Sequence, residues 1–269
     1  MRPAFALFLL AFCALALGAP TAGAAVRSVY LEELTWTELR DALASGTTTI
    51  ILPVGGTEQS GPHLALGKHN VRAKVLAGRI AAALGDTLVA PVLSYVPEGN
   101  VSPPSEHMRF PGTISIPVAA FKSTLEGAAR SLRQAGFTQI VLIGDHGGYQ
   151  EQLKDVAAEL NRAWAGTPSH AHFIAAYYRA TETTYVQALK AKGLSAQEIG
   201  EHAGAADTSL MLAIDPSLVR NERLDEKAGA SAGVSGDPRQ STASLGQIGV
   251  DMIVTDTVAA IRKARLEKR

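Results

Sequence analysis

The sequence has almost no cysteine, since its 269 residues include a single one, Cys13. Cys13 lies in a short apolar run, Ala4–Leu17, which follows Arg2 and precedes the segment Ala22-Gly23-Ala24. A basic residue, a short apolar run and an A-x-A site are typical of a secretory signal peptide, predicted here over residues 1–24. Cleavage would leave a mature chain without cysteine, so disulfides and thiolate chemistry are excluded. Any metal must then be held by histidine and carboxylate.

The sequence also lacks an N-terminal apolar run of the roughly 20 residues that a membrane-spanning helix needs. An uncleaved signal anchor is the alternative to a cleaved peptide. A lipoprotein is disfavoured, because Cys13 lies inside the apolar run and not at its end. We therefore predict export across the inner membrane to a bacterial periplasm, with no membrane association after cleavage.

Neither sign of charge is in excess, because 25 Lys and Arg residues balance 25 Asp and Glu residues. Removing Arg2 with the signal peptide leaves 25 − 1 = 24 basic residues against 25 acidic ones. The absence of an excess or a long run of basic residues argues against nucleic acid and anionic membrane as partners, and we predict neither. The remaining residues, 25–269, suit a single domain with a large core.

Buried strands and amphipathic helices alternate along the mature chain. The predicted strands are Thr48–Val54, Thr87–Val96, Gly112–Ile116, Gln139–Ile143 and His172–Tyr177. The predicted helices are one within Val26–Ser45, Asn70–Leu84 with Asn70 as N-cap, Val118–Ala135, Tyr149–Trp164, Thr181–Lys192, Ala196–Ile199 and Ser241–Arg265, with a surface excursion at Asn221–Pro238. This alternation predicts an α/β fold, a three-layer α/β/α sandwich with a mostly parallel central sheet.

Two of the predicted strands end in polar, glycine-rich turns. Glu58 and His69 follow the first strand, and Asp145-His146 follows Gln139–Ile143. Ligands of open parallel sheets bind beyond the carboxyl ends of the strands, so these turns are expected to converge. Glu58, His69 and His146 form a two-histidine, one-carboxylate set that suits a catalytic Zn²⁺ with an open position for water. The spacing alone is a weak signal, because a single histidine is more often structural.

Five stretches in a fixed order add a family resemblance. They are PVGGTEQSGPHLALGKHN (53–70), HMRFPGTISI (107–116), QIVLIGDHGG (139–148), HAGAADTSLML (202–212) and GVSGDPRQSTASLG (233–246). Through them the chain resembles the creatininase (creatinine amidohydrolase) family. The resemblance implies a three-layer, metal-dependent amidohydrolase that acts on non-peptide and cyclic amide C–N bonds, usually as an assembly of six subunits.

The resemblance assigns ligand positions one residue at a time, and the chain departs from the family at several of them. Glu58 matches the first glutamate ligand and His146 matches a ligand histidine, whereas Ser60 stands where the family has a histidine. His69 stands where the family has a metal-bridging aspartate, and Gly148 where some members have a glutamate. A neutral imidazole binds through one nitrogen at a time, so His69 cannot bridge two ions. We therefore predict one Zn²⁺ per chain, held by Glu58, His69 and His146, with Mn²⁺ or a second metal as alternatives.

The expected chemistry is attack of a metal-activated water on an amide carbonyl. His202, which matches the histidine of the family's HAG segment, is the predicted donor of a proton to the leaving nitrogen, and Asp207 is predicted to orient the water or to complete the metal shell. Further candidates for substrate contacts or for bracing the ligands are Ser60, His63, Glu106, His107 and Asp145, the last as a partner of His146.

These patterns together predict an exported hydrolase of a small-molecule amide, assembled as a homo-oligomer, which the resemblance suggests is a hexamer. The alternative is a non-catalytic binding or assembly protein that keeps the fold but has lost the metal and the activity.

Overall fold

The computed structural model describes residues 27–225 and 229–267. The predicted signal peptide lies outside the described residues. The central sheet consists of β1 (Thr49–Val54), β2 (Thr87–Val89), β3 (Gln139–Gly144) and β4 (His170–Phe173). Its order is β2-β1-β3-β4, and every neighbouring pair is parallel. The predicted parallel sheet is thus confirmed.

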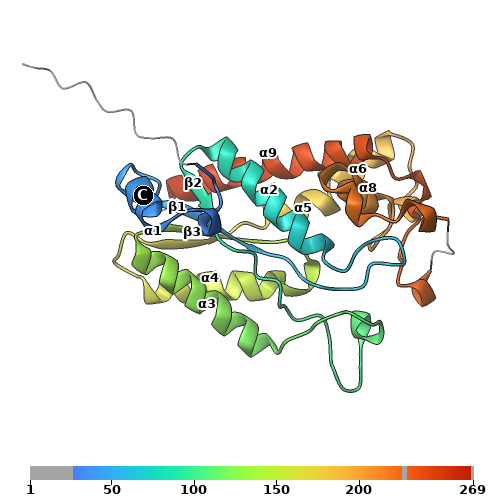
Figure 1. Cartoon of the computed structure of the whole chain (residues 1–269), viewed down its shortest axis with the longest axis horizontal. Helices are drawn as coiled ribbons and strands as arrows, with labels where there is room; N and C mark the ends of the chain where they lie inside the picture. Colours follow the sequence, from blue (N-terminus) through green and yellow to red (C-terminus); the bar gives the residue numbers. More distant parts are fainter. Residues whose placement is uncertain (1–26, 226–228, 268–269) are drawn as a thin grey trace, which may run out of the picture.

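Helices cover both faces of this sheet (Figure 1). One face packs against α3 (Val118–Ala135) and α4 (Gln150–Ala163), and the other against α2 (Lys68–Leu84), α5 (Ala176–Glu182) and α9 (Ala243–Glu267). The remaining α-helices of the described chain are α1 (Trp36–Ala44), α6 (Thr184–Ala191), α7 (Ala196–Ile199) and α8 (Ala205–Ile214). The predicted three-layer α/β/α sandwich is therefore confirmed.

The side chains of β1 alternate between two apolar cores, as the two-residue period of a strand requires. Ile50 and Leu52 face the core formed with α3 and α4, whereas Ile51 faces the core formed with α2, α5 and α9. Helix α9 is apolar and long enough to cross a membrane by composition and length alone. Its residues Ile253 and Ile261 are fully buried in the second core, as expected of a core helix in a folded domain.

Several element boundaries differ from those predicted. The run predicted as a strand over Thr87–Val96 forms a ladder only as far as Val89, because Pro91 cannot donate a backbone hydrogen bond. Predicted strand Gly112–Ile116 is reduced to one bridge, from Ser115 to Val96. The fourth strand ends at Phe173, and residues 176 and 177, which the sequence predicts in the strand, belong to α5.

The helix predicted from Asn70 begins two residues earlier, at Lys68, with Gly67 at its N-cap. The Asn70 side chain binds the preceding loop instead of the helix terminus: it accepts a hydrogen bond from the backbone of Gly56 and donates one to Thr57 Oγ1. This side chain therefore ties the start of α2 to the loop that follows β1.

The segment predicted as a surface excursion, Asn221–Pro238, returns to the interior near its end. Val234 is buried, and Ser235 pairs through its backbone with His202. The closing part of the segment therefore packs beside a predicted site residue.

The connections that follow β1 and β3 lead to strands at opposite edges of the sheet. It passes from β1 to β2 through α2 on one face of the sheet, and from β3 to β4 through α4 on the other face. A crevice forms where the strand order reverses in this way, at the carboxyl ends of the two strands. The loop after β1 and the turn after β3 meet there, because the two strands are in register as far as Val54 and Gly144.

Candidate metal and active site

Glu58 is the centre of this crevice, with no exposed surface. Its Oε1 atom lies 2.8 Å from His69 Nε2 and 3.8 Å from Lys68 Nζ. Its Oε2 atom lies 3.3 Å from His146 Nε2 and 3.5 Å from His107 Nε2. Burial on its own raises the pKa of Glu58, but its close contacts with the imidazoles of His146 and His69 outweigh it and hold the pKa well below its usual range. Glu58 is therefore an anion whose two oxygens face different groups.

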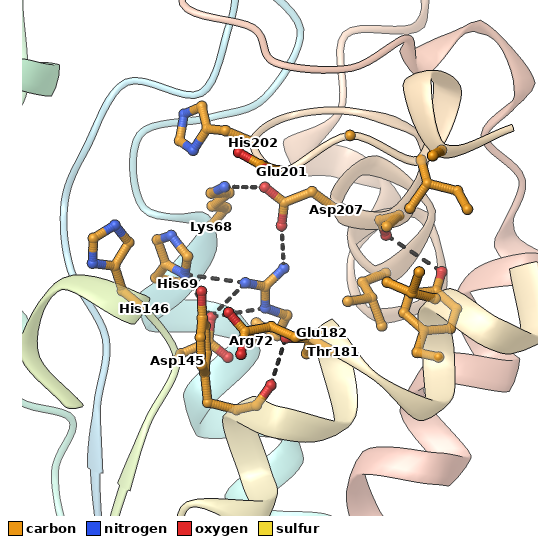
Figure 2. Close-up of a pocket in the computed structure, with 18 of the residues that line it drawn as sticks. Lys68, His69, Arg72, Asp145, His146, Thr181, Glu182, Glu201, His202 and Asp207 are labelled. Atoms are coloured by element: carbon orange, nitrogen blue, oxygen red, sulfur yellow. Dashed lines mark hydrogen bonds and ion pairs between the residues drawn. The ribbon is translucent and has the colours of Figure 1, made fainter.

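On the Oε1 side lies a set of ion-paired residues that we call the paired cluster: Lys68, His69, Arg72, Asp145 and Asp207. Lys68, His69 and Arg72 share one face of α2, because residues three and four apart are neighbours on a helix. Arg72 contacts Asp145 at 2.7 Å through Nη2 and Asp207 at 2.5 Å through Nη1. Lys68 also pairs with Asp207, which Figure 2 shows between the two cations.

Both aspartates of the paired cluster are fully satisfied. Asp145 accepts from His69 at 2.6 Å on Oδ1 and from the hydroxyl of Tyr177 at 2.6 Å on Oδ2. Burial raises the pKa of each aspartate, but Arg72 outweighs it at Asp145, and Lys68 with Arg72 outweighs it at Asp207, so both values are lowered. Buried charges are tolerated when paired in this way, so the paired cluster is a stable, ionised support for the site.

On the Oε2 side lies a second set, which we call the acceptor cluster: Glu58, Glu98, His107 and His146. Glu98 is 4 % exposed, and neither of its carboxylate oxygens hydrogen-bonds to any residue that the structure describes. Its Oε2 atom lies 3.6 Å from His146 Nε2. Burial raises the pKa of Glu98 to about 7; the nearby His146 opposes this shift, and the negative charge of Glu58 adds to it.

Three members of the acceptor cluster can hold a metal ion. Glu58, His107 and His146 each offer one ligand atom, and these atoms all lie within 4.8 Å of one another. Two ligand atoms about 2.0–2.1 Å from a tetrahedral ion are roughly 3.3 Å apart. Oε2 of Glu58 approaches the two Nε2 atoms at 3.3 and 3.5 Å, close to that spacing. The donor set therefore fits a divalent metal.

The predicted ligand His69 belongs to the paired cluster. Its Nε2 faces Glu58 at 2.8 Å and its Nδ1 faces Asp145 at 2.6 Å. Both ring nitrogens are thus engaged by carboxylate oxygens, and Nδ1 also lies 3.1 Å from Arg72 Nη2. Ligation by His69 stays a prediction, and it would require one of the two contacts to open. In the set of mutually close ligand atoms, the second histidine beside His146 is His107.

The two predicted catalytic residues also lie in the crevice. His202 donates from Nε2 to the backbone oxygen of Gln59 at 3.0 Å, and its Nδ1 lies 3.7 Å from Glu58 Oε1. Burial and the nearby Lys68 ammonium lower the pKa of His202 to about 3, so the ring is neutral at pH 7. Asp207 has both oxygens engaged by cations. The proton-donor role of His202 and the water- or metal-binding role of Asp207 stay predictions.

The other candidates are distributed around this centre. Ser60 is fully buried, and His63 Nε2 contacts the Thr208 hydroxyl at 3.0 Å. Glu106 is exposed at the start of the 3-10 helix Glu106–Arg109, which also carries His107. Asp145 is predicted to orient His146, whereas the hydrogen bonds of its carboxylate within the described chain go to His69, Arg72 and Tyr177.

Sequence reasoning missed Lys68, Arg72, Gln59 and Glu98. The first two had a signal, because Arg72 follows Lys68 by four residues on a helix that also carries His69. Gln59 contacts His107 Nδ1 at 2.7 Å, and it directly follows the ligand candidate Glu58. Glu98 had no such signal, since it lies in a loop outside every family stretch.

A cavity of about 650 Å³ opens beside the two clusters. His146, His202 and the paired cluster line it (Figure 2), together with side chains from α5, α6 and α7. Pockets of this size enclose small organic ligands. The crevice therefore combines a metal-capable group with space for a substrate.

Residues 32–261 match the family model described as creatininase, creatinine amidohydrolase. The chain belongs to the creatininase family. It is 31 % identical over 205 residues to the creatinine amidohydrolase of Pseudomonas putida, covering 74 % of this chain and 76 % of that one. It is 30 % identical over 228 residues to a mycofactocin precursor peptide peptidase of Mycolicibacterium smegmatis, covering 76 % and 81 % of the two chains.

Solved structures agree with this family membership. A creatininase structure titled as the manganese form superposes with a TM-score of 0.74 at 25 % identity, covering 88 % of this chain and 99 % of that one. A variant creatininase titled as a Zn-Zn type gives a TM-score of 0.72 at 26 % identity, covering 88 % and 98 %. Members of this family thus include metal-bound amidohydrolases.

Proposed function

We propose that this creatininase-family chain is an exported, metal-dependent amidohydrolase that cleaves a non-peptide or cyclic amide C–N bond. One observation carries the proposal: the buried Glu58 carboxylate presents Oε2 to the Nε2 atoms of His107 and His146 at ligand spacing. The relatives named as creatinine amidohydrolase and as manganese and zinc creatininases support it.

Glu58, His107 and His146 would hold the ion through Oε2 and the two Nε2 atoms. When bound, the metal supplies a Lewis acid for the amide carbonyl and lowers the pKa of its water from 15.7 to about 7. Two imidazoles favour Zn²⁺ over Mn²⁺. Ligation through Nε2 places the ring proton on Nδ1. The contact of His107 Nδ1 with Gln59 Nε2 at 2.7 Å and that of His146 Nδ1 with the Gly148 backbone nitrogen at 3.1 Å must therefore change on metal binding.

The paired cluster favours one metal per chain. The other oxygen of Glu58, Oε1, already faces His69 and the buried ammonium of Lys68. Asp207, the alternative ligand for a second ion, has both oxygens engaged by Lys68 and Arg72. A second divalent ion on this side would therefore lie against buried cations, where like-charge repulsion is weakly screened.

His202 is the group best placed to handle protons on the cavity side. Its ring is neutral at pH 7, so it cannot donate a proton at the outset. To act as a donor it would first have to take up a proton, which its pKa of about 3 makes unfavourable at neutral pH, and then pass that proton to the leaving nitrogen. The Lys68 ammonium beside it would stabilise negative charge that develops in the crevice.

A bond in a short peptide is the second candidate substrate. A cavity of about 650 Å³ is larger than a single small ring requires. A relative named as a peptidase of a precursor peptide favours the same reading.

The test is an activity panel on the purified mature chain. Small cyclic amides, formamides and short peptides would be assayed with Zn²⁺, after chelation, and after Zn²⁺ is restored. We expect turnover that chelation removes and zinc restores, together with about one zinc per chain. The absence of both zinc and turnover would favour the non-catalytic binding protein instead.

Export and assembly complete the proposal. We propose a periplasmic homo-oligomer, and support for an interface comes from exposed apolar side chains around the loop that follows β2: Leu66, Tyr95, Val101, Ile114 and Val118. The N-terminal mass of the periplasmic protein and its molar mass by light scattering test the two statements. A cytoplasmic protein that retains residues 1–24, or a monomer, would contradict them.

A further inference from the structure

We propose that Glu98 is a fourth metal ligand, which joins Glu58, His107 and His146 on the same ion. This inference rests on the proposed metal-dependent function. It adds a residue that lies outside all five family stretches of the sequence.

The first argument is the environment of the carboxylate. Glu98 is 4 % exposed, and its two oxygens make no hydrogen bond within the described part of the chain. A carboxylate removed from water needs a proton or a cation to offset its lost hydration. The neighbouring buried carboxylates Asp145 and Asp207 each have a cation within hydrogen-bond distance. Glu98 faces the imidazole of His146 instead.

The second argument is geometric. Oε2 of Glu98 lies 3.6 Å from His146 Nε2, and that nitrogen lies 3.3 Å from Glu58 Oε2. Both distances are close to the roughly 3.3 Å that separates two ligand atoms on one tetrahedral ion. The two carboxylates therefore approach the same ligand nitrogen. The mutually close ligand atoms are those of Glu58, His107 and His146, so Glu98 would have to turn its side chain to join them on the ion.

The local backbone makes room for this carboxylate. The backbone nitrogen of Glu98 donates to Ser115 Oγ at 3.0 Å, which anchors the loop. Gly56 has a φ of +151°, and a Cβ atom at this position would lie 2.7 Å from Glu98 Oε1. A larger residue at position 56 would push the Glu98 carboxylate away from its present place.

The third argument is the balance of charge and ligands. Two carboxylates neutralise one divalent cation, which is favourable at a buried site. The chain has Ser60 and Gly148 at two positions where the resemblance places a histidine and a glutamate. Glu98 would supply a carboxylate from a different loop, so the ion would have four protein ligands, two carboxylates and two imidazoles.

The test is a titration of the mature chain with Zn²⁺ and Co²⁺. We would compare the wild type with Glu98→Gln, Glu98→Ala and the matched control Glu151→Gln, an exposed glutamate in the first turn of α4. Loss of an outer-shell partner costs about 10–100-fold in metal affinity, so loss of a direct ligand should cost on the order of 100-fold or more. Both Glu98 variants should also change the visible absorption of bound Co²⁺. The control should stay within about twofold of the wild type.

Thermal unfolding separates ligation from a folding defect. With chelator present, Glu98→Gln should have a Tm at or above that of the wild type, because it replaces a buried unpaired carboxylate by a neutral amide. The rise in Tm on adding Zn²⁺ should shrink. Wild-type affinity and an unchanged Co²⁺ spectrum in both Glu98 variants would overturn the proposal, and so would a Tm below wild type with a full zinc-induced rise. A wild-type chain that binds no zinc would instead refute the proposed function on which it rests.

Discussion

The two clusters that meet at Glu58 differ in how many of their carboxylate oxygens accept a hydrogen bond. In the paired cluster, each carboxylate oxygen of Asp145 and Asp207 has a donor. In the acceptor cluster, Oε2 of Glu58 and both oxygens of Glu98 have no hydrogen bond from the described residues. Buried polar groups are nearly always satisfied, so an unsatisfied set at a crevice indicates a place where something binds.

The difference follows from where the side chains come from. The cations of the paired cluster lie on one face of a single helix, α2, so their spacing is set by the helix itself. The acceptor cluster is assembled from separate loops: Glu98 after β2, His107 in the 3-10 helix and His146 after β3. A helix supplies rigid support, and the loops that it supports supply the groups that bind, as is common in α/β enzymes.

The largest expected effect comes from Glu58→Ala, because Glu58 belongs to the acceptor cluster and also contacts the paired cluster. We expect the variant to lose its zinc and its hydrolytic activity. Its zinc affinity and its turnover should each fall by more than the roughly 10–100-fold that removal of an outer-shell partner costs. Metal analysis and turnover of the purified variant would measure this. One zinc retained per chain would show that the acceptor cluster does not depend on this carboxylate.

Next in size is the effect of Arg72→Met, which should act on the paired cluster. It removes the guanidinium that holds both Asp145 and Asp207. Breaking a buried ion pair costs about 3–5 kcal/mol, so the free energy of unfolding should fall by that amount in denaturant titrations. The control Arg79→Met, exposed on the same helix, should stay within about 0.5 kcal/mol. Equal stabilities of the two variants would contradict the distinction between the clusters.

The pH dependence of stability should differ between the clusters as well. Glu98 is an acid whose pKa is raised in the folded state, from 4.5 to about 7, chiefly by burial. With chelator present, the folded state therefore binds more protons than the unfolded state between these values, and stability is lost as pH rises through the window. Relative to Glu98→Gln, the wild type should lose on the order of 3 kcal/mol between pH 4.5 and 7. A constant difference across this range would refute the shift.

The smallest expected effect is that of Lys68→Met on His202. Burial and the Lys68 ammonium both lower the pKa of this imidazole, to about 3. Removing the nearby positive charge favours the imidazolium, so the pKa should rise, by about one unit or less. An NMR titration of the ring protons would measure the change. A pKa that stays the same or falls would show that the ammonium does not act on the cavity side of the site.

How far the fold could be predicted depended on whether the signal was local. The helix predicted over Val118–Ala135 matches α3 at both ends, because its apolar spacing and the flanking Pro117 and Gly136 are local features. The long strand predicted from Thr87 ends as a continuous ladder at Val89, because Pro91 has no amide donor, and pairing with β1 returns only as a single bridge from Leu93 to Val54. Hydrophobic character alone could not show where that pairing ends.

The same distinction between local and non-local signals applies to the residues of the site. Glu58 and His146 could be found from the sequence, since each follows a buried strand and the family stretches contain both. The position of Glu98 beside them could not be found from the sequence, because it depends on how a long loop folds back across the sheet. Only the structure shows that His69 lies between two carboxylates while His107 lies at ligand distance from Glu58.

The order of residues along the chain by itself determined the layered architecture and the family, because apolar periodicity and ordered motifs are properties of the sequence. The tertiary structure decided which histidines face a common point and which carboxylates have a cation. Those choices depend on side chains brought together from distant parts of the sequence, such as Gln59 and His202, which are 143 residues apart. Packing sets these positions, and no local pattern in the sequence encodes them.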